Sequence, residues 1–156
     1  MRKTKNFLVA VDGSPTSLKA AKQAVDIARK YSSSLTFLSV VKDPDIFFEG
    51  RSEFAAGIDM ESVIDNLKAQ HTNMLDEVIP TLPDLHDIPY EKFVTVGDPY
   101  KGIISIAEEK GSDLIVIGRR GYSKIKRLFF GSVSKNVVTH AHCPVLVIME
   151  DEDAEE

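Results

Sequence analysis

Short apolar runs alternate with amphipathic stretches along this 156-residue chain. Strands are expected where apolar residues follow one another or alternate with polar ones, and helices where apolar residues recur every three or four positions. By these criteria the expected strands cover 7–11, 35–41, 90–96, 114–117 and 144–149, and helical patterns separate them. Strands that alternate with helices predict right-handed βαβ units and a parallel sheet.

Two glycine turns indicate the order of the strands. The first and fourth strands are short, wholly apolar and followed by Asp12-Gly13 and Gly118, so we place them at the centre of the sheet. The expected fold class is α/β: a single-domain, five-stranded parallel sheet in the order 3-2-1-4-5, with helices on both faces. In such sheets a ligand binds beyond the carboxyl ends of the strands where the winding reverses, here between strands one and four.

Residues with capping preferences mark the expected helix ends. Ser14 and Asp98 each stand before a proline, which favours an N-cap followed by proline at the first helical position. Gly111 stands where a C-terminal cap is expected. The last helix is expected from Ser132 to His140, with Ser132 as a candidate for its N-cap.

Composition limits the class of protein. The chain is 43% apolar and 28% charged, as ordinary globular domains are, and no apolar run approaches the ~18 residues that cross a bilayer. The single cysteine, Cys143, excludes an internal disulfide and suits a reducing compartment, so we expect a cytoplasmic protein without a membrane partner. Residues 1–149 are expected to form the domain, and the acidic segment 150–156 a disordered tail.

Charge is unevenly distributed along the chain. The net charge of −5 argues against a nucleic-acid partner. One basic cluster, taken alone, indicates a solvated loop; it comprises Arg119, Arg120, Lys124, Lys126 and Arg127.

Three glycines near the C-terminus form the most informative motif. Gly118, Gly121 and Gly131 follow the fourth strand in the spacing G-x2-G-x9-G-S, which leads into the last helix. Glycine lets the backbone approach a ligand closely, and free N–H groups at the start of a helix attract anions. The spacing therefore predicts a phosphate site that is neither the usual P-loop nor the dinucleotide fingerprint.

Several groups near this motif are candidate phosphate ligands. The amides of Ser132 and Val133 are expected to donate hydrogen bonds, aided by the partial positive charge at the helix start. The hydroxyls of Ser132 and Ser134 are further candidate donors. Arg119 or Arg120 is expected to neutralise phosphate charge.

Asp12 ends the first strand at the same crevice. It is expected either as a turn residue, because Asp-Gly is a common turn pair, or as an acceptor for a ribose hydroxyl or a ligand of phosphate-bound magnesium. Capping accounts for Asp98, and His71 is expected as a hydrogen-bonded core histidine because it lies on the apolar stripe of its helix. No cluster has metal-ligand spacing and no nucleophile–base team is evident, so no catalytic residue and no metal ligand are assigned.

Together, the strand ends and the glycine motif described above resemble those of the universal stress protein family. The resemblance runs from Phe7 to Met149, and its carrying segments are 8–14, 96–99, 112–118 and 118–148. The last of them contains Gly131-Ser132-Val133-Ser134 and the spacing G-x2-G-x9-G-[ST], which marks the ATP-binding branch. The resemblance implies an adenine-nucleotide α-hydrolase-like fold and ATP, with or without Mg²⁺, as the ligand.

The resemblance also implies a role for each matching position. Asp12 and the backbone of Ala10 and Val11 would border the adenosine, and the main chain of Val40 would meet the adenine edge. The ribose and phosphates would be held by the motif residues, which are Gly118, Gly121, Gly131, Ser132, Val133 and Ser134. The chain departs from the family pattern at Arg119-Arg120, where smaller or less charged residues are frequent, and at Ala10, where some relatives carry proline.

Members of this family tend to dimerise through the last strand, and the residues here agree with that. Strand 144–149 is apolar enough to be buried, yet the order 3-2-1-4-5 puts it at an edge, where an uncovered apolar strand promotes aggregation. An antiparallel strand from a second subunit would cover it. We therefore expect a homodimer through 144–149.

The expected function is that of an ATP-binding, nucleotide-dependent regulator in a stress response, with a signalling partner that the sequence does not identify. At most slow hydrolysis is expected, because no water-positioning residue is found. One alternative is a dimeric interaction module that binds no nucleotide and recruits partners through the dimer surface and the loop Phe47–Phe54. The other is an adenine-nucleotide α-hydrolase-type enzyme that cleaves ATP to AMP and pyrophosphate.

Overall fold

Strands and helices alternate along the chain in the computed structural model, which describes residues 5–44, 57–119 and 131–149. The elements are β1 (Asn6–Ala10), α1 (Pro15–Tyr31), β2 (Ser34–Lys42), α4 (Met60–Val78), the 3₁₀ turn η1 (Ile79–Thr81), β3 (Tyr90–Gly97), α5 (Pro99–Glu109), β4 (Leu114–Gly118), α6 (Ser132–His140) and β5 (Val145–Ile148). The loop Phe47–Phe54 and the acidic segment 150–156 lie outside the described residues.

The strands form one parallel sheet in the order β3-β2-β1-β4-β5, which confirms the predicted fold class. β1 lies at the centre and pairs with β2 on one side and β4 on the other. The chain therefore winds outward in both directions from β1, and the reversal falls between β1 and β4. In this architecture the carboxyl ends of β1 and β4 frame the ligand crevice.

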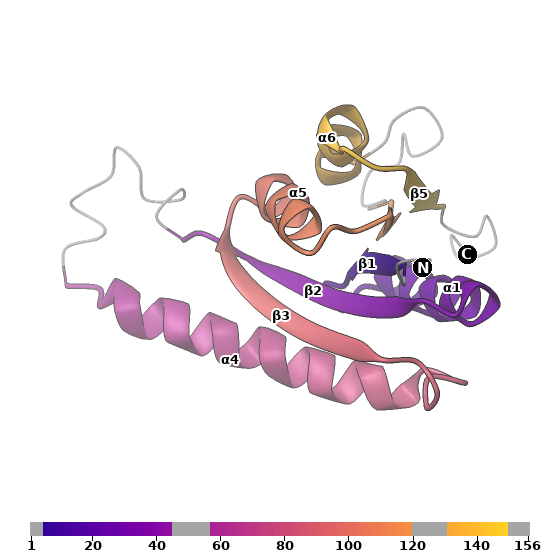
Figure 1. The fold of residues 1–156 in the computed structure, drawn as a ribbon. Coiled ribbons are helices and arrows are strands. Elements are labelled where there is room, and N and C mark those ends of the chain that lie inside the picture. Colours follow the sequence, from indigo (N-terminus) through magenta and orange to yellow (C-terminus); the bar gives the residue numbers. More distant parts are fainter. Residues whose placement is uncertain (1–4, 45–56, 120–130, 150–156) are drawn as a thin grey trace, which may run out of the picture.

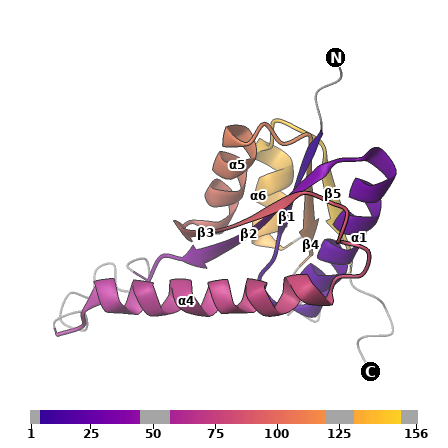
Figure 2. The ribbon, with the colours of Figure 1, turned by 60° about the horizontal axis from the view of Figure 1, so that its bottom comes forward.

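Helices cover both faces of the sheet (Figure 1). α1 and α4 pack on one face, around Phe37, Val9 and Leu75. α5 and α6 pack on the other face, around Leu8 and Ile115. Figure 2 shows α4 running beneath the sheet, with its first turns extending beyond the strands. Wholly buried apolar side chains from both faces of the central strands thus fix the positions of the strand ends.

β2 runs farther than its apolar run predicts. It extends through Lys42, which pairs with Gly97 of β3, whereas the last pairing of β2 with β1 joins Leu38 to Ala10. One further backbone hydrogen bond, from Val11 N to Leu38 O at 2.8 Å, follows that pairing. A charged side chain does not end a strand when it can reach solvent while its backbone stays paired. The end of β2 therefore stands out beyond the end of β1.

The predicted ends of α1 and α5 are confirmed in part. Ser14 is the N-cap of α1, where its side chain accepts a hydrogen bond from Ser17 N at 3.2 Å, and proline follows it. Gly111 follows the C-cap of α5 with φ +61°, a conformation that favours glycine. Asp98 occupies the N-cap position of α5, but its side chain makes no capping hydrogen bond. The prediction that capping fully accounts for Asp98 was therefore wrong.

The last helix spans the expected range Ser132–His140, but it begins one residue earlier than the candidate cap suggested. Gly131 is the N-cap of α6 and Ser132 is its first residue, so the N-cap role considered for Ser132 is wrong. No side-chain hydrogen bond from a described residue caps this helix. Among the described residues, no side-chain acceptor therefore competes for the amide groups at the start of α6.

Candidate functional site

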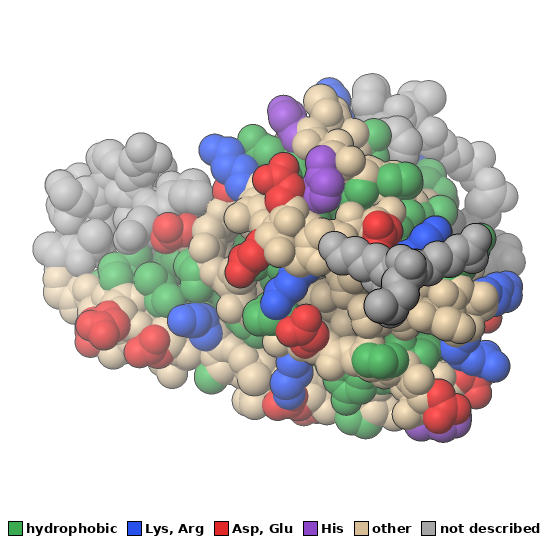
Figure 3. Space-filling model, viewed as in Figure 1, with side chains coloured by type: hydrophobic (Ala, Val, Ile, Leu, Met, Phe, Trp, Pro, Cys, Tyr) green, Lys and Arg blue, Asp and Glu red, His purple; other side chains and the backbone are tan. Residues whose placement is uncertain are grey.

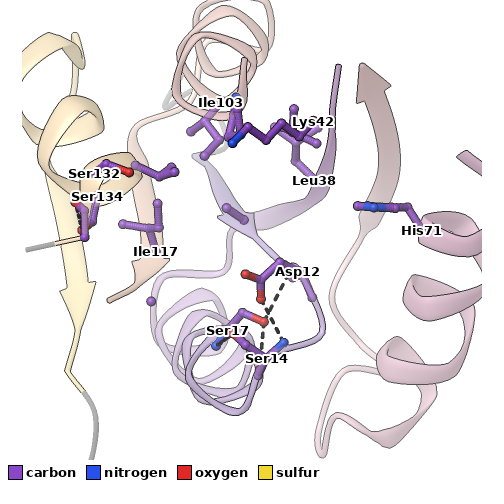
Figure 4. Close-up of a pocket in the computed structure, with 17 residues that line it drawn as sticks. Asp12, Ser14, Ser17, Leu38, Lys42, His71, Ile103, Ile117, Ser132 and Ser134 are labelled. Carbon is purple, nitrogen blue, oxygen red and sulfur yellow. Dashed lines mark hydrogen bonds between the residues drawn. The ribbon is translucent and has the colours of Figure 1, made fainter. Parts of the chain in front are cut away.

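A cavity of about 430 Å³ opens at the carboxyl ends of β1, β2 and β4 (Figure 4). Its volume falls within the range of about 300–1,000 Å³ that is usual for small-molecule sites. The cavity lies at the predicted reversal of the winding. Its lining residues are Ala10, Val11, Asp12, Ser14, Ser17, Leu38, Val40, Lys42, His71, Pro99, Ile103, Ile117, Gly118, Gly131, Ser132, Val133 and Ser134.

The fold brings most of the predicted site residues together around this cavity. They come from the end of β1, from β2, from the end of β4 and from the first turn of α6; they are Ala10, Val11, Asp12, Val40, Gly118, Gly131, Ser132, Val133 and Ser134. Arg120 and Gly121 lie outside the described residues. Segments that are far apart in sequence thus meet at one opening.

Arg119 is placed differently from its neighbours in the motif. Its backbone N donates to Ile148 O at 2.8 Å, and only 7% of the residue is exposed. Arg119 does not line the cavity, although the preceding residue, Gly118, does. Its Nε and Nη2 have no hydrogen-bond partner within the described part of the chain. The contact of Arg119 with phosphate therefore stays a prediction.

Asp12 has the predicted turn role and also lies at the cavity wall. Its Oδ1 accepts a hydrogen bond from Ser14 N at 2.9 Å, and its own backbone N donates to Ser17 Oγ at 3.2 Å, so it shapes the turn into α1. The residue is nevertheless exposed and lines the cavity. In Figure 4 its carboxylate lies between α1 and the end of β1. A turn residue can therefore present an acceptor to a ligand here.

Gly118 has a packing reason to be glycine. A Cβ built at this position would lie 2.9 Å from the backbone C and O atoms of Thr16, in the first turn of α1. Such a contact is far too short, and the backbone on either side cannot move without shifting β4 or α1. Gly118 therefore lets the end of β4 approach α1, as well as lining the cavity.

The first turn of α6 forms one end of the cavity. Ser134 is buried, and its Oγ donates to Gly131 O at 3.0 Å, which occupies that hydroxyl proton within the turn. Ser132 is exposed and points toward the opening (Figure 4). The backbone amides at the helix start carry partial positive charge, so this end of the cavity favours an anion.

His71 is a cavity residue that sequence reasoning assigned to the core. It is only half-buried, and its Nδ1 lies 2.7 Å from the Oγ of buried Ser39 in β2. Burial lowers the pKa of His71 below its ordinary value, while the charge of Asp12 acts in the opposite direction. The hydrogen bond was expected, but the position at the cavity wall was not. Helical spacing cannot reveal it, because a residue facing a cavity keeps the same periodicity as one facing a core.

Lys42 and the start of α5 also line the cavity without having been predicted. Lys42 extends from β2 across the opening toward Ile103 of α5 (Figure 4). The extension of β2 past β1 places it there. The only sequence indication was its position directly after an apolar strand on the ligand side of the sheet.

One face of the molecule shows no dominant charge. On the face drawn in Figure 3, acidic and basic side chains are interspersed and do not form an area of one sign. Within residues 5–44, 57–119 and 131–149, no group of three or more His, Cys, Asp or Glu side chains is arranged to hold a metal ion. Nor does any helix in these ranges combine the length and the apolarity needed to cross a membrane.

The fold is that of a doubly wound α/β protein, with a cavity at the reversal of its sheet. Residues 3–149 match the sequence profile of the Universal stress protein family, and the chain belongs to that family. Universal stress protein MJ0531 of Methanocaldococcus jannaschii is 30% identical over 145 residues, which cover 92% of this chain and 81% of that protein.

Solved structures agree with this assignment. The structure of the protein MJ0577 has a TM-score of 0.77 and 26% identity, and the match covers 95% of this chain and 97% of the other. Two universal stress proteins with 22% and 20% identity show the same fold with TM-scores of 0.59 and 0.56. These matches cover 94% and 95% of this chain, and 97% and 99% of the others. The first was solved in complex with cAMP, and the second, from Archaeoglobus fulgidus, in complex with dAMP.

Proposed function

We propose that this chain binds ATP in the cavity and acts as a nucleotide-dependent regulator in a stress response in the cytoplasm. The observation that carries the proposal is the joining of the glycine motif, the start of α6 and the ends of β1 and β2 around one cavity of nucleotide size. The cAMP and dAMP complexes of two proteins with this fold are consistent with an adenine nucleotide at the same place.

The start of α6 forms the end of the proposed site that would bind the phosphates. The uncapped start of α6 supplies the amides of Ser132 and Val133, and its dipole favours negative charge. A phosphate tail would accept hydrogen bonds from these amides. Mg²⁺, where it accompanies ATP, would neutralise part of the phosphate charge, and Asp12 at the cavity wall is a candidate ligand for it.

The main chain of Val40 is suited to the base edge of the nucleotide. Leu38 O points toward β1, because it accepts a hydrogen bond from Val11 N. Backbone groups of a strand alternate in direction, so the N–H and C=O of Val40 point to the same side as those of Leu38. Since β1 has already ended, these two groups face the cavity and are available to a planar base.

The site holds a ligand more readily than it transforms one. The described lining residues contain no nucleophile paired with a base. Asp12 is engaged with the turn into α1, and the Oγ of Ser134 donates within α6. We therefore propose ATP binding with at most slow hydrolysis.

A Gly131→Val substitution tests this proposal. Gly131 has φ −60° and ψ 157°, which any residue adopts, so the backbone tolerates a side chain. The valine methyl groups would intrude on the path of the phosphates, and we expect the thermal shift produced by ATP to disappear while the unliganded melting temperature stays close to wild type. An equal ATP shift in both proteins would contradict the proposed site.

We also propose that the chain forms a homodimer through 144–149. The two edges of the sheet differ. β3 carries Glu91, paired with Lys110, and Lys92, paired with Asp76, and such charges oppose strand addition. All four residues of β5 are apolar and half-buried. An antiparallel β5 from a second copy would cover this edge and continue the sheet.

A further inference from the structure

The two ends of the cavity differ in chemistry. Ser132 and Ser134 of α6 lie at one end, and His71 of α4 lies at the opposite end, with Asp12 between them (Figure 4). α4 contains no part of the glycine motif. Through His71, α4 supplies an imidazole to the cavity that the proposed phosphate site does not use.

The ring of His71 is held in a defined orientation. Ser39 Oγ lies 2.7 Å from Nδ1 and is buried within β2, so this hydrogen bond ties α4 to the strand that borders the cavity. Met74, one turn further along α4, packs close to Gly13 beside Asp12. The Nε2 atom makes no hydrogen bond to a described residue. In a neutral imidazole, Nε2 offers one donor or one acceptor, depending on the tautomer that Ser39 selects.

The charges near His71 disfavour a phosphate at this end. Asp12 is close enough for its carboxylate to influence the imidazole, and the same negative charge would repel a phosphate. Burial favours the neutral ring, which attracts anions weakly. An uncharged, flat group with a polar edge fits better, and Leu38 and Val40 of the same strand supply apolar contacts.

We propose that His71 binds the nucleobase of the nucleotide, with Nε2 hydrogen-bonded to a nitrogen or exocyclic group on the edge of the base. Ser39 is then a positioning residue, because it acts through the imidazole. This inference rests on the proposed function and adds to it a contact from outside the glycine motif.

The test measures the affinities of three probes for wild type and His71→Ala by calorimetry. For the weakest-binding probe, the affinity is obtained from its competition with ATP. The probes are ATP, 2′,3′-dideoxy-ATP and inorganic tripolyphosphate. Loss of one base contact is expected to weaken ATP and dideoxy-ATP equally, by about tenfold, and to leave tripolyphosphate unchanged. Ser39→Ala, which keeps the imidazole but frees its orientation, is expected to show a smaller loss with the same selectivity.

His86→Ala is the matched control, because His86 is exposed, paired with Asp87 and absent from the cavity lining. His71→Gln, checked by its melting temperature without ligand, replaces the alanine variant if that one does not fold. Unchanged ATP affinity, or an equal loss for tripolyphosphate, would overturn the inference and leave the proposed function standing. A loss for ATP but not for dideoxy-ATP would assign His71 to the ribose and overturn the base contact. Wild-type protein that binds none of the probes would overturn both.

Discussion

Gly118 ends β4 beside the first turn of α1, at a point where the main chain of Thr16 leaves no room for a side chain. The same residue lines the cavity. Close packing of strand and helix, and close approach of backbone to ligand, therefore both require glycine at this position. Asp12 likewise has two positions at once, because it closes the turn into α1 and also lines the cavity.

A Gly118→Ala substitution is expected to destabilise the fold by about 1–3 kcal/mol, the range typical of overpacking. Urea unfolding measures this loss. Gly102→Ala in α5 is the control, because there the added Cβ would meet the side chain of Val40 at 3.1 Å instead of backbone, and alanine favours helix. An equal or greater loss in Gly102→Ala would refute the packing explanation.

His71 is expected to make stability depend on pH. Burial lowers its pKa in the folded state below the ordinary value of 6.5, so the unfolded chain takes up a proton first as the pH falls. The contribution of His71 to stability is then complete above about pH 6.5 and is lost as the pH falls toward the lowered folded value. Unfolding free energies at several pH values should fall more steeply in wild type than in His71→Gln. Parallel curves would show that His71 is not responsible.

At the scale of elements, the proposed binding surfaces lie at one helix start and at one edge of the sheet. α1 begins with a side-chain cap from Ser14, whereas α6 begins at Gly131 without one. The uncapped helix is the one that faces the proposed phosphates. Likewise, β3 protects its edge with charged pairs, whereas β5 presents only apolar side chains. The helix start without a side-chain cap is the proposed phosphate site, and the strand edge without charged side chains is the proposed dimer interface.

Val147→Lys is expected to convert a dimer to a monomer. Val147 is half-buried at the middle of the exposed edge, and a lysine there can extend into solvent within one chain but opposes an added strand. Sedimentation velocity measures the change, and circular dichroism checks that the fold persists. Lys92→Val on the other edge is the matched exchange and should leave the mass unchanged. A monomeric wild type, or a dimeric Val147→Lys protein, would contradict the proposed interface.

At the scale of the whole molecule, the two helix layers meet at the reversal of the winding. α1 and α4 approach the cavity from one face and α5 and α6 from the other, so every layer contributes lining residues. The strand order followed from short apolar runs before glycine turns, and it places Asp12 and Gly118 together without further information. Chain order and burial together therefore determine where a ligand can enter.

The parts that sequence reasoning missed depend on tertiary contacts. The second strand was expected to end at Val41, but it continues through Lys42, because a charge after an apolar run does not show whether backbone pairing continues. His71 was assigned to the core, because helical periodicity does not tell which part of a helix lies over a cavity. The missing side-chain hydrogen bond at Asp98 is likewise a matter of local geometry, since sequence indicates only the preference for a cap.

The central claim is that this cavity holds ATP, and calorimetric titration of the full chain with ATP tests it most directly. We expect saturable binding of one ATP per chain with a Kd well below 1 mM, which corresponds to more than about 4 kcal/mol of binding free energy. Absence of measurable affinity below about 1 mM, with and without Mg²⁺, would contradict the account.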